Sequence, residues 1–217
     1  MIKAIIFDFD GVIAESTDVK TRAFRKLFEN EGEAVAESVE RYHKENQGVS
    51  RFEKFRYIYT EILKRDLCES EYINLCDAFS QLVKDDVIRA PLVKGALDFL
   101  KRYSSRYLFF VASATPQEEM KTIISAKGLT CYFKDVYGAP RRKGDMVNSI
   151  KKQYGFLSNE VVYVGDAWSD FEAAKSNMVH FVARVTRDID VFRDLTCERL
   201  ADLTELKRIV DSIERSL

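Results

Sequence analysis

Near its N-terminus the chain reads Ala4-Ile5-Ile6-Phe7-Asp8-Phe9-Asp10-Gly11. A short apolar run that ends in a turn signal is typical of a strand buried on both faces of a parallel sheet. In an open parallel sheet, ligands bind in the crevice outside the carboxyl ends of the strands. The stretch therefore predicts a parallel β/α fold with Asp8 and Asp10 at its ligand-binding edge.

Four further apolar runs have the same character. They lie at residues 107–112, 135–138, 161–164 and 180–185. Stripes of apolar residues at helical spacing separate them, and Gly128 and Gly155 stand where two of these helices are expected to end. Strand alternating with helix predicts the α/β class, with a Rossmann-like, doubly wound parallel sheet as the core.

One long stretch, residues 15–89, interrupts this alternation. It contains helical stripes but no convincing strand, so we interpret it as an α-helical cap domain inserted after the first strand. Residues 1–14 and 90–217 would then form the Rossmann-like catalytic core. A length of 217 residues suits one α/β core with a modest insert.

Polar side chains follow the predicted strands and are expected to meet at one edge of the sheet, because parallel strands end on the same side. They are Asp8, Asp10, Ser113, Lys143, Asp166 and Asp170. Carboxylate oxygens suit an octahedral Mg²⁺ that keeps several waters beside a substrate phosphate. We therefore predict a Mg²⁺ site formed by the four aspartates.

The residue types also suggest a division of labour. Asp8 would attack phosphorus as a carboxylate nucleophile, which divides one difficult displacement into two easier ones. Asp10 would protonate the leaving oxygen and then deprotonate water. Lys143 would offset the negative charge that gathers there. The Ser113 hydroxyl and nearby backbone N–H groups would bind phosphoryl oxygens, with Ala114 among the expected substrate contacts.

The most informative part of the insert is Gly48-Val49-Ser50-Arg51-Phe52-Glu53. Ser50 and Glu53 have the spacing of a capping box, so a helix is expected to begin at Arg51. A helix N-terminus with an adjacent arginine is suited to an anion, and Gly48 would permit a close approach. We therefore predict that Arg51 contacts the substrate.

Two lysines of the insert, Lys20 and Lys54, are further candidates for substrate binding. His43 is interpreted as a surface residue of the cap. Closure of the cap would exclude water from the first chemical step and then admit one for the second.

The motifs appear in a fixed order: Asp8-Phe9-Asp10-Gly11-Val12, an apolar strand ending in Ser113, Lys143 after Gly138-Ala139-Pro140, and Gly165-Asp166-Ala167-Trp168-Ser169-Asp170. Each alone has an ordinary explanation, such as a capped helix or a charged surface run. Together they strongly resemble the four signatures of the haloacid dehalogenase superfamily. The resemblance implies a Rossmann-like core, and an insert after the first signature is called a C1 cap in that superfamily.

The resemblance also implies roles for the aspartates. Asp166 would bind Mg²⁺ together with Asp8 and the carbonyl of Asp10, while Asp170 would act directly or through water. Dehalogenases and phosphonoacetaldehyde hydrolases resemble this core but lack the acid/base aspartate that Asp10 provides. Its presence favours phosphoryl transfer to or from oxygen.

Two C1-capped branches resemble the chain: phosphoglycolate phosphatases, which hydrolyse small phosphate monoesters, and β-phosphoglucomutases, which move phosphate within a sugar. Mutases carry a histidine where alignment places Lys20, so a phosphatase is the main prediction and a phosphomutase the alternative. A non-catalytic phosphate-binding module is disfavoured because it has no need of Asp10. A receiver domain is disfavoured by the helical insert.

Composition narrows the choice of partners. The 34 basic and 35 acidic residues leave a net charge of −1, so no overall basic field attracts nucleic acid. The four cysteines form no CxxC pair and have no nearby histidine cluster, which disfavours a zinc site or disulfide framework. No apolar run approaches the ~20 residues of a membrane span. We expect a cytoplasmic monomer or weak homodimer acting on a small phosphorylated metabolite.

Overall fold

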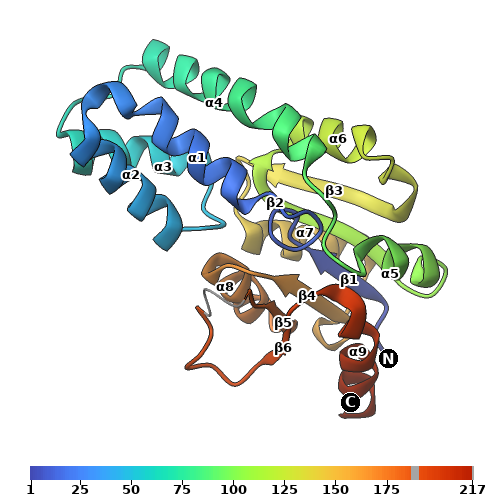
Figure 1. Cartoon of the computed structure of the whole chain (residues 1–217). Helices are drawn as coiled ribbons and strands as arrows, with labels where there is room; N and C mark the ends of the chain where they lie inside the picture. Colours follow the sequence, from blue (N-terminus) through green and yellow to red (C-terminus); the bar gives the residue numbers. More distant parts are fainter. Residues whose placement is uncertain (187–190, 217) are drawn as a thin grey trace.

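The computed structural model describes residues 1–186 and 191–216, in which six parallel strands form one sheet (Figure 1). The strands are β1 (Ala4–Phe7), β2 (Leu108–Pro116), β3 (Phe133–Ala139), β4 (Val161–Gly165), β5 (His180–Arg184) and β6 (Glu198–Leu200). Their order is β3-β2-β1-β4-β5-β6. The chain runs outward from β1 to β3 and then returns to place β4 beside β1. The carboxyl ends of β1 and β4 therefore flank the point where strand order reverses, which is where such sheets bind ligands.

The predicted fold class is confirmed, and all five predicted strands are present with small shifts at their ends. β2 continues to Pro116, so Ser113 lies within this strand and not after it. The register of its pairing with β3 shifts between Ala112 and Pro116, and through this shift the strand continues past the expected turn. The sixth strand, β6, was not predicted because only one of its three residues, Leu200, is buried.

Helices cover both faces of the sheet. The core helices are α5 (Ala96–Tyr103), α6 (Gln117–Ala126), α7 (Lys143–Tyr154), α8 (Trp168–Ser176) and α9 (Leu206–Ser216), with short 3₁₀ turns at Thr130–Tyr132, Ser158–Glu160 and Leu203–Glu205. Helices α7 and α8 pack with Ile6 and Tyr163 in one apolar cluster, whereas α5, α6 and α9 pack with Ile5 and Phe7 in the other. Alternate residues of β1 thus face opposite layers, as a strand buried on both sides requires.

Every secondary-structure element of the insert is a helix or a helical turn. It comprises α1 (Thr17–Leu27), the 3₁₀ turn Glu29–Glu31, α2 (Glu33–Glu45), α3 (Arg51–Tyr57), the π-helix Ile58–Leu63 and α4 (Glu69–Arg89). Figure 1 shows α1, α2 and α3 grouped at one end of the molecule, with α4 running from that group toward α6. Aromatic rings fill the interior of the insert, where Phe24 contacts both Phe55 and Phe79.

The two chain segments that join insert and core lie side by side. The Glu15 N–H donates to the Pro91 carbonyl at 2.9 Å, and the Val93 N–H donates to the Ile13 carbonyl at 3.0 Å. The insert therefore leaves and re-enters the core through one paired junction. This junction lies close to the predicted domain boundaries, which remain a prediction.

Across the described parts of the chain, no helix combines the length and the apolar character that crossing a membrane requires.

Candidate active site

The strand register places three of the predicted residues at one edge of the sheet. Phe7 of β1 is paired with Val111 of β2 and with Val164 of β4. Asp8 follows directly after Phe7, and its N–H donates to the Val164 carbonyl at 2.9 Å. Ser113 and Asp166 each lie two residues past the paired position. The edge predicted from separate sequence segments thus forms one site.

Lys143 links two of the aspartates. As the first residue of α7 it donates from Nζ to Asp8 Oδ2 at 2.7 Å and to Asp170 Oδ1 at 2.6 Å, and all three side chains are buried. Asp170 also accepts from the Tyr163 hydroxyl at 2.8 Å and from the Ala167 N–H at 3.0 Å. Asp170 is therefore fixed by three donors, and it orients Lys143 toward Asp8.

This arrangement depends on a glycine at the end of β4. A Cβ atom on Gly165 would lie 2.2 Å from the Cβ of Asp170, far inside van der Waals contact. Glycine at this position lets the first turn of α8 approach the strand closely enough for Asp170 to reach Lys143. The signature that begins at Gly165 thus has a steric origin.

Three carboxylates form a cluster that fits a divalent cation. Asp8, Asp166 and Asp170 each offer an oxygen, and these oxygens all lie within 4.8 Å of one another. Burial raises the pKa of Asp166 well above its usual value, and the nearby charges of Asp8 and Asp170 raise it further. A cation bound among these oxygens would relieve this repulsion, and an all-oxygen donor set matches the preference of Mg²⁺.

The pKa of Asp8 is also raised. Burial is the largest cause, and Asp170 and Asp10 add to it, while the Lys143 ammonium opposes the shift. Burial by itself would lower the pKa of Lys143, but the charges of Asp170 and Asp8, together with the hydrogen bonds to them, outweigh burial and raise it. Lys143 therefore stays charged beside Asp8, as its predicted role requires.

The carboxylate of Asp10 lies outside this three-carboxylate cluster. Its Oδ1 accepts from the Ser16 hydroxyl at 2.6 Å, and its Oδ2 is paired with the Lys20 ammonium and accepts from the Thr115 hydroxyl at 3.3 Å. Burial raises the pKa of Asp10, but the charge and hydrogen bond of Lys20, the hydrogen bond of Ser16 and the charge of Lys143 together outweigh burial and hold the pKa below its usual value. Asp10 is thus ionised and held by a lysine of the insert.

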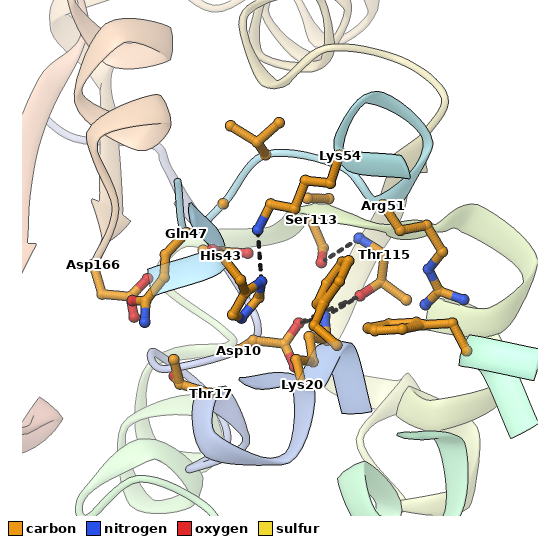
Figure 2. Close-up of a pocket in the computed structure, with 16 residues that line it drawn as sticks. Asp10, Thr17, Lys20, His43, Gln47, Arg51, Lys54, Ser113, Thr115 and Asp166 are labelled. Atoms are coloured by element: carbon orange, nitrogen blue, oxygen red, sulfur yellow. Dashed lines mark hydrogen bonds and ion pairs between the residues drawn. The ribbon is translucent and has the colours of Figure 1, made fainter. Parts of the chain in front are cut away.

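A cavity of about 50 Å³ lies between these core residues and the insert. Figure 2 shows Asp10, Ser113 and Asp166 around it, with Lys20, Arg51 and Lys54 entering from the insert. The Ser113 side chain is buried, and its Oγ accepts from the Thr115 N–H at 3.1 Å. Ala114 also lines the cavity.

The loop before α3 touches the core beside Lys143. A Cβ atom on Gly48, whose φ is +76°, would lie 2.3 Å from Ser169 Oγ and 3.1 Å from Lys143 Nζ. Only a residue without a side chain fits there, since the left-handed backbone and the close approach both exclude larger ones. The insert is therefore closed over the carboxylate cluster in this structure.

Helix α3 begins at Arg51 as predicted, and Ser50 Oγ accepts from the Glu53 N–H at 3.4 Å. The Arg51 guanidinium lines the cavity but is engaged by the protein itself. It forms two hydrogen bonds with the Glu119 carboxylate, at 2.7 and 3.0 Å, and donates to Ser80 Oγ at 2.5 Å. The predicted substrate contact of Arg51 remains a prediction, and its observed role is to join the insert to α6.

The expectation that His43 lies at the surface is wrong. Its side chain is buried on the inner face of α2, where its ring stacks on Phe24 at a centroid distance of 4.5 Å. Its Nδ1 is hydrogen bonded to Lys54 Nζ at 2.8 Å. Ala36 and Val39 precede it at helical spacing on the same buried face, and that period in the sequence indicates the burial.

The structure adds residues that sequence reasoning missed. Tyr163 positions Asp170, and Ser16 and Thr115 both contact Asp10. Tyr163 lies within an apolar strand, where its hydroxyl gives no local signal of a polar partner. Glu119 likewise occupies an ordinary helical position at the start of α6, so its pairing with Arg51 depends on how insert and core pack.

Comparison with known proteins supplies independent findings. The model of one protein family, described as haloacid dehalogenase-like hydrolase, matches residues 5–184. A phosphorylated carbohydrates phosphatase of Thermotoga maritima is 26% identical over 198 residues, which cover 87% of this chain and 88% of that protein.

Solved structures agree in fold. A β-phosphoglucomutase from Clostridium difficile is 18% identical, with a TM-score of 0.79 over 100% of this chain and 99% of that one. A predicted phosphoglycolate phosphatase from Haemophilus somnus is 16% identical, with a TM-score of 0.77 over 96% of this chain and 98% of that one. At this identity the two structures show a shared fold, which includes both core and insert.

Proposed function

The chain belongs to the haloacid dehalogenase-like hydrolase family, and on that premise we propose that it is a Mg²⁺-dependent phosphatase acting on a small phosphate monoester through an aspartyl-phosphate on Asp8. One observation carries the proposal. Asp8 lies at the cavity with its carboxylate held by Lys143, in a cluster with Asp166 and Asp170. The predicted enzyme class, phosphoric monoester hydrolase, agrees with the family and with its named phosphatase relative.

The first step follows from the position of Asp8. An oxygen of its carboxylate attacks phosphorus, and the bond from phosphorus to the ester oxygen breaks. Lys143, which donates to Asp8 Oδ2, offsets the charge that builds up as two anions approach. The Ser113 hydroxyl accepts from the Thr115 N–H, so its own hydrogen is available to a phosphoryl oxygen.

Asp10 serves both steps in the proposed mechanism. Its proton goes to the ester oxygen as the alcohol leaves, and the resulting carboxylate then takes a proton from the water that attacks the phosphorylated Asp8. That attack breaks the bond between phosphorus and the Asp8 oxygen and releases inorganic phosphate. Because Asp10 is ionised here, it must take up a proton before this step, from water or from a monoprotonated phosphate group of the substrate.

Asp8, Asp166 and Asp170 are the residues that would hold the metal, since their oxygens converge and no softer donor belongs to the cluster among the described residues. Members of the superfamily generally use a divalent cation, and Mg²⁺ suits these hard oxygens. When bound, it would supply positive charge to the phosphoryl oxygens and relieve the repulsion among the carboxylates.

The test is phosphate release from a panel of phosphate monoesters, with Mg²⁺ and with EDTA. We expect Mg²⁺-dependent release by the wild type and a loss of about 10³-fold or more in Asp8→Asn, because an amide is a poor nucleophile for phosphorus. Asp85→Asn, at an exposed position of α4, is the matched control and should retain full activity.

Retention of most activity in a clean Asp8→Asn preparation would contradict the aspartyl-phosphate mechanism. Release that is indifferent to EDTA would contradict the metal requirement. If no ester on the panel releases phosphate, phosphorus NMR of sugar-phosphate mixtures decides between a phosphomutase, which shows isomerised products, and a non-catalytic phosphate-binding module, which shows none.

A further inference from the structure

The cations around the cavity differ in how their charges are balanced. Lys20 is paired with Asp10, and Arg51 is paired with Glu119. Lys54 also lines the cavity and is only 1% exposed, yet within the described residues no carboxylate forms an ion pair with it. Its polar partner there is His43 Nδ1, at 2.8 Å. A buried lysine without an acidic partner is costly to fold and calls for an explanation.

His43, the partner of Lys54, also has a ring nitrogen without a hydrogen-bond partner among the described residues. Burial, together with Lys54 and Lys20, lowers the pKa of His43 to about 2, so the ring is neutral. When Lys54 is charged, its ammonium has only donors, so Nδ1 accepts from Lys54 and the ring hydrogen belongs on Nε2. Nε2 is buried and has no hydrogen-bond partner in the part of the chain that the structure describes. His43 lines the same cavity as Lys54, as Figure 2 shows.

Within the described residues Lys54 has no acidic partner and His43 Nε2 has no acceptor, and both residues line one cavity, which points to a ligand that brings an anionic acceptor. We propose that Lys54 and His43 form a subsite for a second anionic group, a carboxylate or a second phosphate, on the substrate. This rests on the proposed function, which assigns the transferred phosphoryl group to Asp8, Lys143 and Ser113. The enzyme accordingly prefers phosphate esters whose carbon skeleton ends in an anion.

The surroundings of the pair support an anionic group over a neutral one. Burial, with repulsion from Lys20 and Lys143, lowers the pKa of Lys54 well below its usual value. An anion beside Nζ would reverse this by favouring the charged form. Phe24 and Phe79 also line the cavity, so a short carbon skeleton between the two charged ends would meet apolar rings.

The pair is a better candidate than Arg51 for reading this group. Arg51 has a buried acidic partner, so binding a substrate anion would require it to give up two hydrogen bonds to Glu119. Lys54 and His43 would not have to give up a hydrogen bond to a protein carboxylate when they bind the substrate anion. A lysine without an acidic partner also discriminates more strongly between anionic and neutral substrates than a paired arginine does, because a neutral substrate leaves its charge buried and unpaired.

The experiment compares matched ligands on wild type, Lys54→Met, His43→Leu and the control Lys84→Met, an exposed lysine of α4. Binding of phosphonopropionate, propane bisphosphonate and propyl phosphonate is measured by calorimetry with Mg²⁺, since phosphonates are not turned over by ester cleavage. We expect the wild type to bind the two ligands that end in an anionic group about 10- to 100-fold more tightly than propyl phosphonate. That ratio should fall toward one in Lys54→Met and His43→Leu and stay unchanged in Lys84→Met.

The same ratio is then measured as kcat/KM for the corresponding phosphate esters. A wild-type ratio near one, or a ratio unchanged in folded Lys54→Met, overturns the subsite. A preference for the bisphosphonate over the carboxylate, or the reverse, identifies which anion the subsite takes. If the phosphonate ratio depends on Lys54 but no ester is hydrolysed, the subsite stands and the proposed function fails.

Discussion

At the scale of single residues, Asp170 shows how much one side chain can organise. The sequence predicts Asp170 as a metal ligand together with Asp8, Asp10 and Asp166. In the structure Asp170 accepts hydrogen bonds from Lys143, Tyr163 and the Ala167 backbone, and it is fully buried. Its role in positioning Lys143 is therefore visible, and its role toward the metal remains a proposal.

His43 leads to a prediction on pH and stability. Its pKa is about 2 in the folded state against about 6.5 in the unfolded chain, so below about pH 6.5 the unfolded state binds a proton that the folded state does not. The free energy of unfolding should therefore fall as pH falls, by about 1.4 kcal/mol per pH unit from this group. His43→Phe should remove that contribution.

The measurement is urea unfolding of wild type and His43→Phe at about pH 7 and about pH 5, compared as the change between the two conditions. A loss of packing in His43→Phe alters the free energy of unfolding equally at both pH values, so it cancels when the pH-induced changes of the two proteins are compared. Lys20, Lys44 and Lys54 are the charges that act on His43, and all three stay in both proteins. Identical pH dependence in the two proteins would show that His43 is not held neutral.

At the scale of elements, the contact between α3 of the insert and α6 of the core rests on the Arg51–Glu119 ion pair. Both side chains are nearly inaccessible, with 3% and 9% of their surface exposed. Removing one partner of a buried pair leaves the other charge unpaired, at a cost of about 3–5 kcal/mol, whereas exposed pairs contribute about 0–1 kcal/mol.

We therefore predict that Glu119→Ala lowers the free energy of unfolding by about 3–5 kcal/mol. Glu118→Ala is the matched control, because the neighbouring Glu118 makes an exposed pair with Lys121 and should change stability by less than about 1 kcal/mol. The double variant Arg51→Met/Glu119→Leu should recover most of the loss, since apolar residues replace the pair. Equal effects of Glu119→Ala and Glu118→Ala in urea unfolding would refute this account.

At the scale of the whole molecule, the fold brings mutually repelling carboxylates together at the ends of β1 and β4. Nothing local favours this, because Asp8 and Asp166 come from opposite halves of the chain and the charge of Asp8 raises the pKa of Asp166. The sheet is stable enough to hold them, and the strand-order reversal places them at the same edge. A bound cation would then add to the stability of the entire fold.

We predict that Mg²⁺ raises the free energy of unfolding, by about 2.7 kcal/mol at a concentration of 100 times its Kd. Asp166→Asn should be more stable than the wild type without Mg²⁺, because one repelling charge is gone, and should lose most of the response to Mg²⁺. Thermal unfolding with and without the ion checks both, with Asp85→Asn as a control that should behave as the wild type. An undiminished Mg²⁺ response in Asp166→Asn would place the ion elsewhere.

Much of this arrangement was accessible from the sequence. Buried parallel strands appear as short apolar runs, and the polar residue that follows each run lies at a common edge because all the strands point the same way. That reasoning predicts that Asp8, Ser113, Lys143 and Asp166 lie around one site. The family that the motifs resemble is confirmed by the family match, and the predicted fold class is confirmed by the sheet. The capping box at Ser50 likewise located the start of α3, because caps are local.

What only the tertiary structure decided is which side chains meet. Arg51 and Glu119 are 68 residues apart, and Tyr163 reaches Asp170 from within an apolar strand. His43 and Lys54 face each other because α2 and α3 pack around the same aromatic interior. Hydrophobic periodicity tells which face of a helix is buried, but the partner of a buried polar group depends on the distance and rotation between packed elements. Those quantities arise from the packing of the whole chain, so no local pattern encodes them.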